Sequence, residues 1–96
     1  MVERKIVKET VTLTNKLGLH ARAAAVLVQT ANKFEAEIVL KKKGNSTWVN
    51  GKSIMGVLML AATRGSSLII KAEGTDAEQM INELSELIAH KFGEEE

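Results

Sequence analysis

Apolar residues recur along this chain with two periods, one typical of strands and one typical of helices. An alternation of apolar and polar positions predicts a strand over residues 5–14, with one face formed by Val7, Val11 and Leu13. A helical spacing predicts a helix over residues 21–32, with a core-facing stripe of Ala24, Leu27, Val28 and Ala31. The chain therefore opens as a strand, a loop and a helix.

The rest of the chain continues in the same way. Residues 36–42 and 46–50 form a predicted hairpin with its turn at Gly44-Asn45 and a solvated lysine run, Lys41 to Lys43, at its tip. Residues 67–73 form a strand that we expect to be central, because it is apolar on both faces. A capping box, Thr75-Asp76-Ala77-Glu78, predicts the start of a last helix, and Gly93 to Glu96 form an expected frayed acidic tail.

A short helix predicted over residues 53–61 is apolar all round. A domain of this size rarely buries every face of such a helix, so we expect part of the helix to form an exposed docking surface. The alternative is a helix tucked under a neighbouring element. The order of elements is then βαββαβα, which predicts one α+β domain over residues 1–96 whose helices cover one face of a four-stranded sheet.

Composition removes several functional classes. The formal net charge of +1 and the three aromatic residues do not favour nucleic-acid binding. The absence of cysteine excludes disulfides and thiolate metal sites, and two histidines alone do not support a zinc site. No phosphate-binding glycine loop is present, and no cofactor is expected. The N-terminus, Met1 to Lys5, precedes no apolar signal core and no membrane-spanning stretch, so we expect a cytoplasmic protein.

His20 stands where the first strand and its loop give way to the first helix. Histidine is an unusual residue for a helix N-cap, where Ser, Thr, Asp and Asn are preferred. The free N–H groups and partial positive charge of a helix start disfavour an imidazolium and attract an anion. A neutral ring keeps a lone pair for attack. Arg22 adds planar donors that suit phosphate oxygens, so the pair suggests transient phosphorylation of His20. The plainer interpretation is a surface histidine without chemistry.

Two motifs resemble one known family. Gly18-Leu19-His20-Ala21-Arg22 is similar to the active-site signature of HPr, the histidine phosphocarrier family of the bacterial phosphoenolpyruvate-dependent phosphotransferase system. Lys52-Ser53-Ile54-Met55-Gly56-Val57 resembles the regulatory-serine signature of that family, and the likeness covers essentially the whole chain. The family often has proline after the motif arginine, whereas this chain has Ala23. A proline pre-sets the first helical turn, so its absence loosens that turn.

The resemblance implies a fold and a function. The fold is an open-faced sandwich with an antiparallel sheet in the order 1-4-2-3. The function is that of a carrier and not of an enzyme: phosphorylated enzyme I transfers its phosphoryl group to Nδ1 of His20, which passes it to a histidine of enzyme IIA while Arg22 neutralises charge. The docking residues implied by the resemblance are Ala21, Arg22, Ile54, Met55 and Leu58.

The resemblance also gives Ser53 a second role. By residue type and position Ser53 is a helix N-cap, and the family signature makes it the target of an HPr kinase/phosphorylase. A transcriptional regulator is a further partner implied by the resemblance, and a monomer is the expected state.

Two alternatives to sugar transport remain. The first is a regulatory HPr-like module in a nitrogen-linked phosphorelay, which neighbouring genes would discriminate from the sugar branch. The second is a small-molecule-binding α+β domain, which explains neither motif. These motifs do not encode which enzyme IIA and which sugar are used, or whether the source organism has the kinase.

Overall fold

The computed structural model describes residues 4–96, and the predicted order βαββαβα is confirmed. The strands are β1 (Lys5–Thr12), β2 (Glu37–Lys42), β3 (Val49–Asn50) and β4 (Ser67–Gly74). The helices are α1 (Ala21–Ala31), α2 (Ile54–Met59) and α3 (Ala77–Ala89), and a 3-10 turn, Lys91–Gly93, follows α3. The expectation that no signal segment begins at Met1 to Glu3 concerns residues outside the described range.

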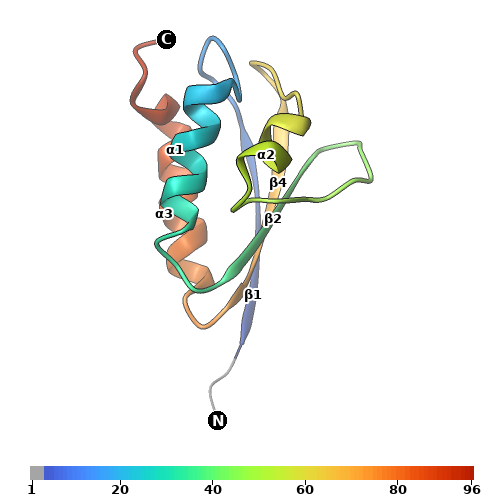
Figure 1. The fold of residues 1–96 in the computed structure, drawn as a ribbon, viewed down its shortest axis with the longest axis vertical. Coiled ribbons are helices and arrows are strands. Elements are labelled where there is room, and N and C mark those ends of the chain that lie inside the picture. Colours follow the sequence, from blue (N-terminus) through green and yellow to red (C-terminus); the bar gives the residue numbers. More distant parts are fainter. Residues whose placement is uncertain (1–3) are drawn as a thin grey trace.

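The four strands form one antiparallel sheet in the order β1-β4-β2-β3, as the resemblance implied. Figure 1 shows α1 and α3 running together along one side of this sheet, and α3 packs against both β1 and β4. The predicted open-faced sandwich is confirmed. Strand β4 is central, paired with β1 from Lys5↔Gly74 to Thr12↔Ser67 and with β2 from Glu37↔Glu73 to Lys42↔Leu68.

The core lies between the sheet and the helices. Alternate residues of β4 and β2 point into it, and the helical stripe predicted for α1 is buried with them. The main buried side chains are Leu27, Val28, Ile38, Leu40, Leu68, Ile70, Met80, Leu84 and Ile88. Burial of this apolar area on one face of the sheet stabilises the layered arrangement.

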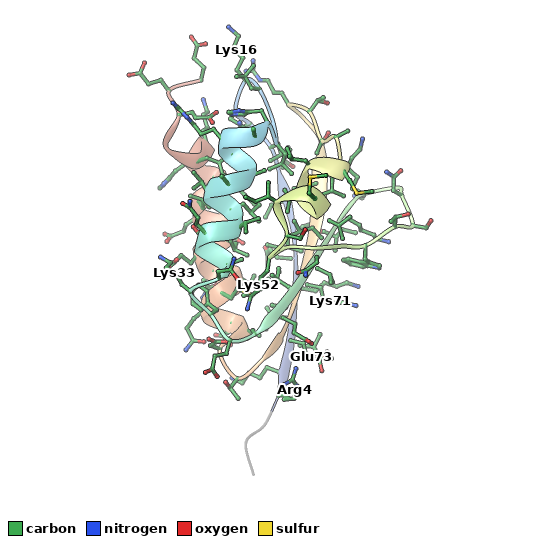
Figure 2. All side chains as sticks on the ribbon, viewed as in Figure 1. Arg4, Lys16, Lys33, Lys52, Lys71 and Glu73 are labelled. Carbon is green, nitrogen blue, oxygen red and sulfur yellow. The ribbon has the colours of Figure 1, made fainter. Side chains whose placement is uncertain are left out.

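The opposite face of the sheet carries polar and charged side chains. The ring of Trp48 packs against two lysines, with Nζ of Lys41 5.0 Å and Nζ of Lys71 4.7 Å from the ring centroid. Such contacts are cation–π interactions. Strand β2 ends at Lys42, as predicted, and Lys41 and Lys42 are half-buried there, so only Lys43 is the solvated lysine that was expected at the hairpin tip. At the far end of the sheet, Figure 2 shows Arg4 beside Glu73, which form an exposed ion pair.

The predicted capping box before α3 is wrong. Asp76 is the N-cap residue, but its side chain makes no capping hydrogen bond. Its carboxylate instead accepts hydrogen bonds from the backbone N–H groups of Glu35 at 2.9 Å and Ala36 at 2.8 Å, just before β2. The two segments approach closely because Gly74 lies against Ala36. A Cβ added to Gly74 would be 2.7 Å from Cα of Ala36. Asp76 therefore ties the start of α3 to the start of β2.

This tie predicts a pH-dependent contribution to stability. The N–H groups of Glu35 and Ala36, with help from the charge of Lys52, hold the pKa of Asp76 below its ordinary value of 3.8. A lowered carboxyl pKa stabilises the fold above the unfolded-state value, and the contribution is lost as pH falls through the folded-state pKa. We expect Asp76→Asn to lower the melting temperature at neutral pH, with the deficit shrinking at more acidic pH. A deficit that is unchanged in strong acid would contradict this account, and thermal unfolding followed by circular dichroism measures it.

Candidate functional site

The loop between β1 and α1 holds its backbone rigidly. Gly18 adopts φ 62°, and a Cβ at that position would lie 2.5 Å from the carbonyl oxygen of Ala62. The neighbouring N–H of Leu19 donates to the same oxygen at 2.9 Å. Only glycine avoids both the backbone strain and the clash. The loop is therefore fixed against the segment after α2, and it presents the next residue, His20, at a defined place.

His20 is the N-cap residue of α1, as predicted. Its backbone is extended, with φ −76° and ψ 178°, and its side chain makes no capping hydrogen bond. Its carbonyl accepts the first helical bond, from the N–H of Ala24 at 2.8 Å. The N–H groups of the first helical turn have no helical partner, so they are available to an anion beside the ring. The imidazole side chain is 28% exposed and can be reached by another molecule.

The C-terminal segment packs against this site as far as Glu94, which a frayed tail from Gly93 onward did not predict, whereas Glu95 and Glu96 are exposed. Phe92 is buried, with only 7% exposed, and anchors the segment on the core. Lys91 and Phe92 have positive φ angles of 57° and 58°, which turn the chain after α3 back toward the start of α1. The carboxylate of Glu94 then reaches His20. The acidic tail therefore belongs to the site.

Glu94 connects two residues that lie far from it in the sequence. Its Oε2 is 2.7 Å from Nε2 of His20, and its Oε1 accepts a hydrogen bond from Nδ2 of Asn15 at 3.0 Å. Asn15 is fully buried, and the same Nδ2 donates to the carbonyl oxygen of Gly18 at 2.8 Å. One buried amide thus ties the loop before α1 to the tail after α3.

The surroundings keep Glu94 ionised. The hydrogen bond from Asn15, the hydrogen bond and charge of His20 and the charge of Arg22 hold the pKa of Glu94 below its ordinary value of 4.5. Glu94 and His20 line an open hollow of about 520 Å³, with Lys16, Arg22 and the last two glutamates around it. Figure 2 labels Lys16 at the end of the molecule where Figure 1 marks the C-terminus, and its Nζ is 3.4 Å from Oε2 of Glu96.

The other predicted site residues of α1 lie at its exposed start. Ala21 and Arg22 are exposed, and Arg22 lines the same hollow as His20. Ala23, where the family often has proline, is buried, and α1 still begins at Ala21. The arrangement therefore combines a reachable imidazole, free N–H donors and a guanidinium, which together suit a phosphoryl group.

Helix α2 is partly exposed, as the first of the two interpretations of its apolar pattern predicted. Met55 is 70% and Met59 is 75% exposed, whereas Val57 is buried. The helix is shorter than predicted, because Ala61 adopts φ 50° and cannot continue it. Of the proposed docking residues, Ile54 is 43% exposed and Leu58 is half-buried.

Ser53 caps α2, as expected from its residue type. Its Oγ accepts a hydrogen bond from the backbone N–H of Gly56 at 3.1 Å, and its carbonyl accepts one from Val57 at 3.0 Å. Helices α1 and α2 pack against each other, which places the apolar surface of α2 next to the helix whose N-cap is His20.

Sequence reasoning missed three residues of the site around His20. Leu17, 64% exposed, adds an apolar side chain to the hollow beside His20. Asn15 and Glu94 were missed because they are 79 positions apart and meet only in the folded chain. A signal for the tail was present: an apolar Phe92 followed by Gly93 is typical of a segment that docks and turns.

Other chemistry finds little support within residues 4–96. No three His, Cys, Asp or Glu side chains gather there as a metal ion would require. None of the helices formed by these residues has the length and apolar character needed to cross a membrane. The second histidine, His90, is exposed at the C-cap of α3.

Comparisons with known proteins agree with the two motifs. The family model described as PTS HPr component phosphorylation site matches residues 7–90. Phosphocarrier protein HPr of Xylella fastidiosa strain Temecula1 is 46% identical over 90 residues, which cover 94% of this chain and 99% of that protein. The crystal structure of HPr-C-His from Thermoanaerobacter tengcongensis has a TM-score of 0.88 at 46% identity, covering 94% of this chain and 99% of that one. A structure described as an HPr dimer from the same organism has a TM-score of 0.72 at 46% identity, covering 88% and 94%.

Proposed function

This chain belongs to the HPr family, and from that premise we propose that it is a phosphocarrier of the phosphoenolpyruvate-dependent phosphotransferase system whose phosphoryl acceptor is His20. The observation that carries the proposal is the position of His20, reachable at the N-cap of α1 beside free N–H donors and Arg22. The protein acts as a stoichiometric carrier in the cytoplasm and not as an enzyme.

The transfer follows from the site. A lone pair on the ring attacks phosphorus of phosphorylated enzyme I, the bond from phosphorus to the donor atom breaks, and its electron pair stays with the donor. The N–H groups at the start of α1 and the guanidinium of Arg22 stabilise the phosphoryl oxygens. In the second transfer His20 is the donor. A lone pair on a histidine of enzyme IIA attacks phosphorus, the bond from phosphorus to His20 breaks, and its electron pair stays with His20. We propose a monomer as the working form, because the carrier must present His20 to each partner in turn.

The direct test is phosphorylation of the intact chain. Incubation with phosphoenolpyruvate and enzyme I should add one acid-labile phosphate, and mass spectrometry should place it on His20. Subsequent addition of enzyme IIA should remove it. A chain that stays unlabelled with an active enzyme I, or that carries an acid-stable phosphate only, would refute the phosphocarrier function.

Arg22 should contribute more to transfer than to folding. Its side chain is exposed, and exposed charges typically contribute under ~1 kcal/mol to stability. Loss of one preorganised donor to developing negative charge can slow a transfer step by about a hundredfold. We expect Arg22→Ala to slow phosphorylation by enzyme I by tenfold or more, with a nearly unchanged melting temperature. Arg64→Ala, at another exposed arginine, is the control and should do neither. A stability loss with normal transfer would reverse the assignment.

Met55 should be part of the docking surface for enzyme I and enzyme IIA, together with Ala21, Arg22, Ile54 and Leu58. Apolar anchors near the centre of an interface provide much of its binding free energy. Because Met55 is 70% exposed, Met55→Glu should leave the fold intact and weaken partner binding by about tenfold. The matched control is Ile6→Glu, which charges another exposed apolar residue (65%) on β1. Calorimetric titration with enzyme I measures both, and equal binding of the two variants would remove Met55 from the interface.

A further inference from the structure

We infer that Glu94 is a positioning residue for the proposed phosphoryl transfer: its carboxylate holds His20 as the Nε2–H tautomer and leaves the attacking lone pair on Nδ1. The inference rests on the proposed function of His20. It concerns a residue of the C-terminal tail that lies outside both signature motifs. The contact that carries it is the 2.7 Å hydrogen bond between Oε2 of Glu94 and Nε2 of His20.

The tautomer follows from donor and acceptor chemistry. An ionised carboxylate only accepts hydrogen bonds, and a neutral imidazole carries one N–H and one lone pair. The short contact therefore requires Nε2 to be the nitrogen that carries the proton. The lone pair is then on Nδ1. Glu94 meets the condition of being ionised with a neutral ring too, because the hydrogen bonds from Asn15 and His20 and the charge of Arg22 lower its pKa.

Glu94 is itself held in place. Each of its oxygens has a partner, Asn15 on one side and His20 on the other, and its side chain is only 13% exposed. Asn15 is fully buried and also bonded to Gly18, while Phe92 anchors the tail two residues before Glu94. A base oriented by a carboxylate that is oriented in turn is the arrangement by which catalytic histidines are kept in one tautomer and one rotamer.

The carboxylate also fits the charge changes of the transfer. When the Nδ1–phosphorus bond forms, Nε2 keeps its proton and the ring gains positive charge, while the bond to the donor breaks with its electron pair. Glu94 faces that charge across the hydrogen bond. The other charged groups around the hollow are Lys16, Arg22, Glu95 and Glu96, which leave Glu94 as the acidic group in contact with the ring. The phosphoryl oxygens meet Arg22 and the helix N–H groups, and the ring meets Glu94.

Replacement of Glu94 by glutamine gives a sharp test, because it should invert the tautomer. Asn15 donates its N–H to the side-chain oxygen at position 94, and it cannot flip its amide without losing its bond to Gly18. The amide oxygen of a glutamine would therefore face Asn15, and its NH₂ group would face the ring. That NH₂ group is a donor and needs an unprotonated Nε2, which moves the proton to Nδ1.

The experiment compares the wild type with Glu94→Gln, Glu94→Ala and the control Glu86→Gln, which makes the same charge change at an exposed residue of α3 outside the hollow. Nitrogen-15 NMR of the imidazole at mildly alkaline pH reads the tautomer without any partner. The initial rate with phosphorylated enzyme I reads transfer, and the melting temperature reads the fold. We expect Nε2–H in the wild type and Glu86→Gln, a shift to Nδ1–H in Glu94→Gln, and transfer slowed about tenfold or more in that variant. Glu94→Ala should lie between the wild type and Glu94→Gln both in the tautomer population and in the transfer rate.

Three outcomes would overturn the inference: the wild-type tautomer in Glu94→Gln, an inverted tautomer with wild-type transfer, or faster transfer in Glu94→Ala. The last result would mean that Glu94 blocks access to His20 instead of positioning its ring. Failure of the proposed function looks different, because the wild type itself would then not be phosphorylated while its tautomer could still be read.

Discussion

Replacing His20 by alanine should abolish phosphorylation of this protein by phosphoenolpyruvate and enzyme I. In the proposed transfer the ring supplies the attacking lone pair, and no other side chain that lines the hollow at the start of α1 has the same chemistry. The other lining residues are Lys16, Leu17, Arg22 and the tail residues 93–96. The fold should survive, because the His20 side chain makes no capping hydrogen bond to α1. Radiolabelled phosphoenolpyruvate measures the loss, and the melting temperature confirms that the variant is folded.

The chain offers a matched control in His90. It is the only other histidine, it is exposed, and it lies at the C-terminal end of α3. A helix C-terminus presents carbonyl groups and a partial negative charge, which repel a phosphoryl group. His90→Ala should therefore accept phosphate at the wild-type rate. Label that survives on His20→Ala and disappears with His90→Ala would show that the acceptor has been assigned to the wrong histidine.

Phosphorylation of Ser53 should slow phosphorylation of His20 by about tenfold or more without unfolding the protein. The phosphate adds nearly two negative charges beside the exposed side chains of Ile54 and Met55. A partner that approaches this surface with its own phosphoryl group then meets repulsion and must desolvate the added charge. The fold should tolerate the change, because a phosphate at an N-cap is stabilised by the N–H groups of the helix start.

The measurement uses HPr kinase/phosphorylase and ATP, mass spectrometry to place the phosphate, and then the assay with enzyme I. Ser53→Ala should remain unmodified and should lose about 1 kcal/mol of stability through the lost cap to Gly56. Ser46→Ala, in the hairpin loop, should be modified normally. Phosphate at another residue, or an unchanged rate with Ser53 fully modified, would leave Ser53 as a structural cap only.

Local patterns were sufficient wherever a side chain's role depends on near neighbours. The spacing of Ala24, Leu27, Val28 and Ala31 predicted which face of α1 is buried, because a helix places residues three and four apart on one side. Ser53 was identified as a cap for the same reason, since its partner Gly56 is three residues away. The exposed surface of α2 followed from a mismatch between an all-apolar helix and a small domain.

Patterns failed where a local partner competes with a distant one. Asp76 stands in a sequence typical of a capping box, yet its carboxylate bonds to Glu35 and Ala36, because the close approach of Gly74 to Ala36 brings their N–H groups within reach. Sheet order is a related case. Alternation within β1 and β4 predicts two strands, but the register Lys5↔Gly74 is a long-range pairing that no local period encodes.

The sequence by itself therefore determined the order of elements, the buried faces and the position of His20 at a helix start, because these depend on residues close together in the chain. Only the tertiary structure decided what His20 faces. Glu94 meets the ring because Phe92 packs in the core, the chain turns at Lys91 and Phe92, and Asn15 is buried under the loop, where it holds the carboxylate. Contacts across 74 and 79 positions depend on packing of the whole domain, so an acidic tail that looks solvated in the sequence becomes part of the site.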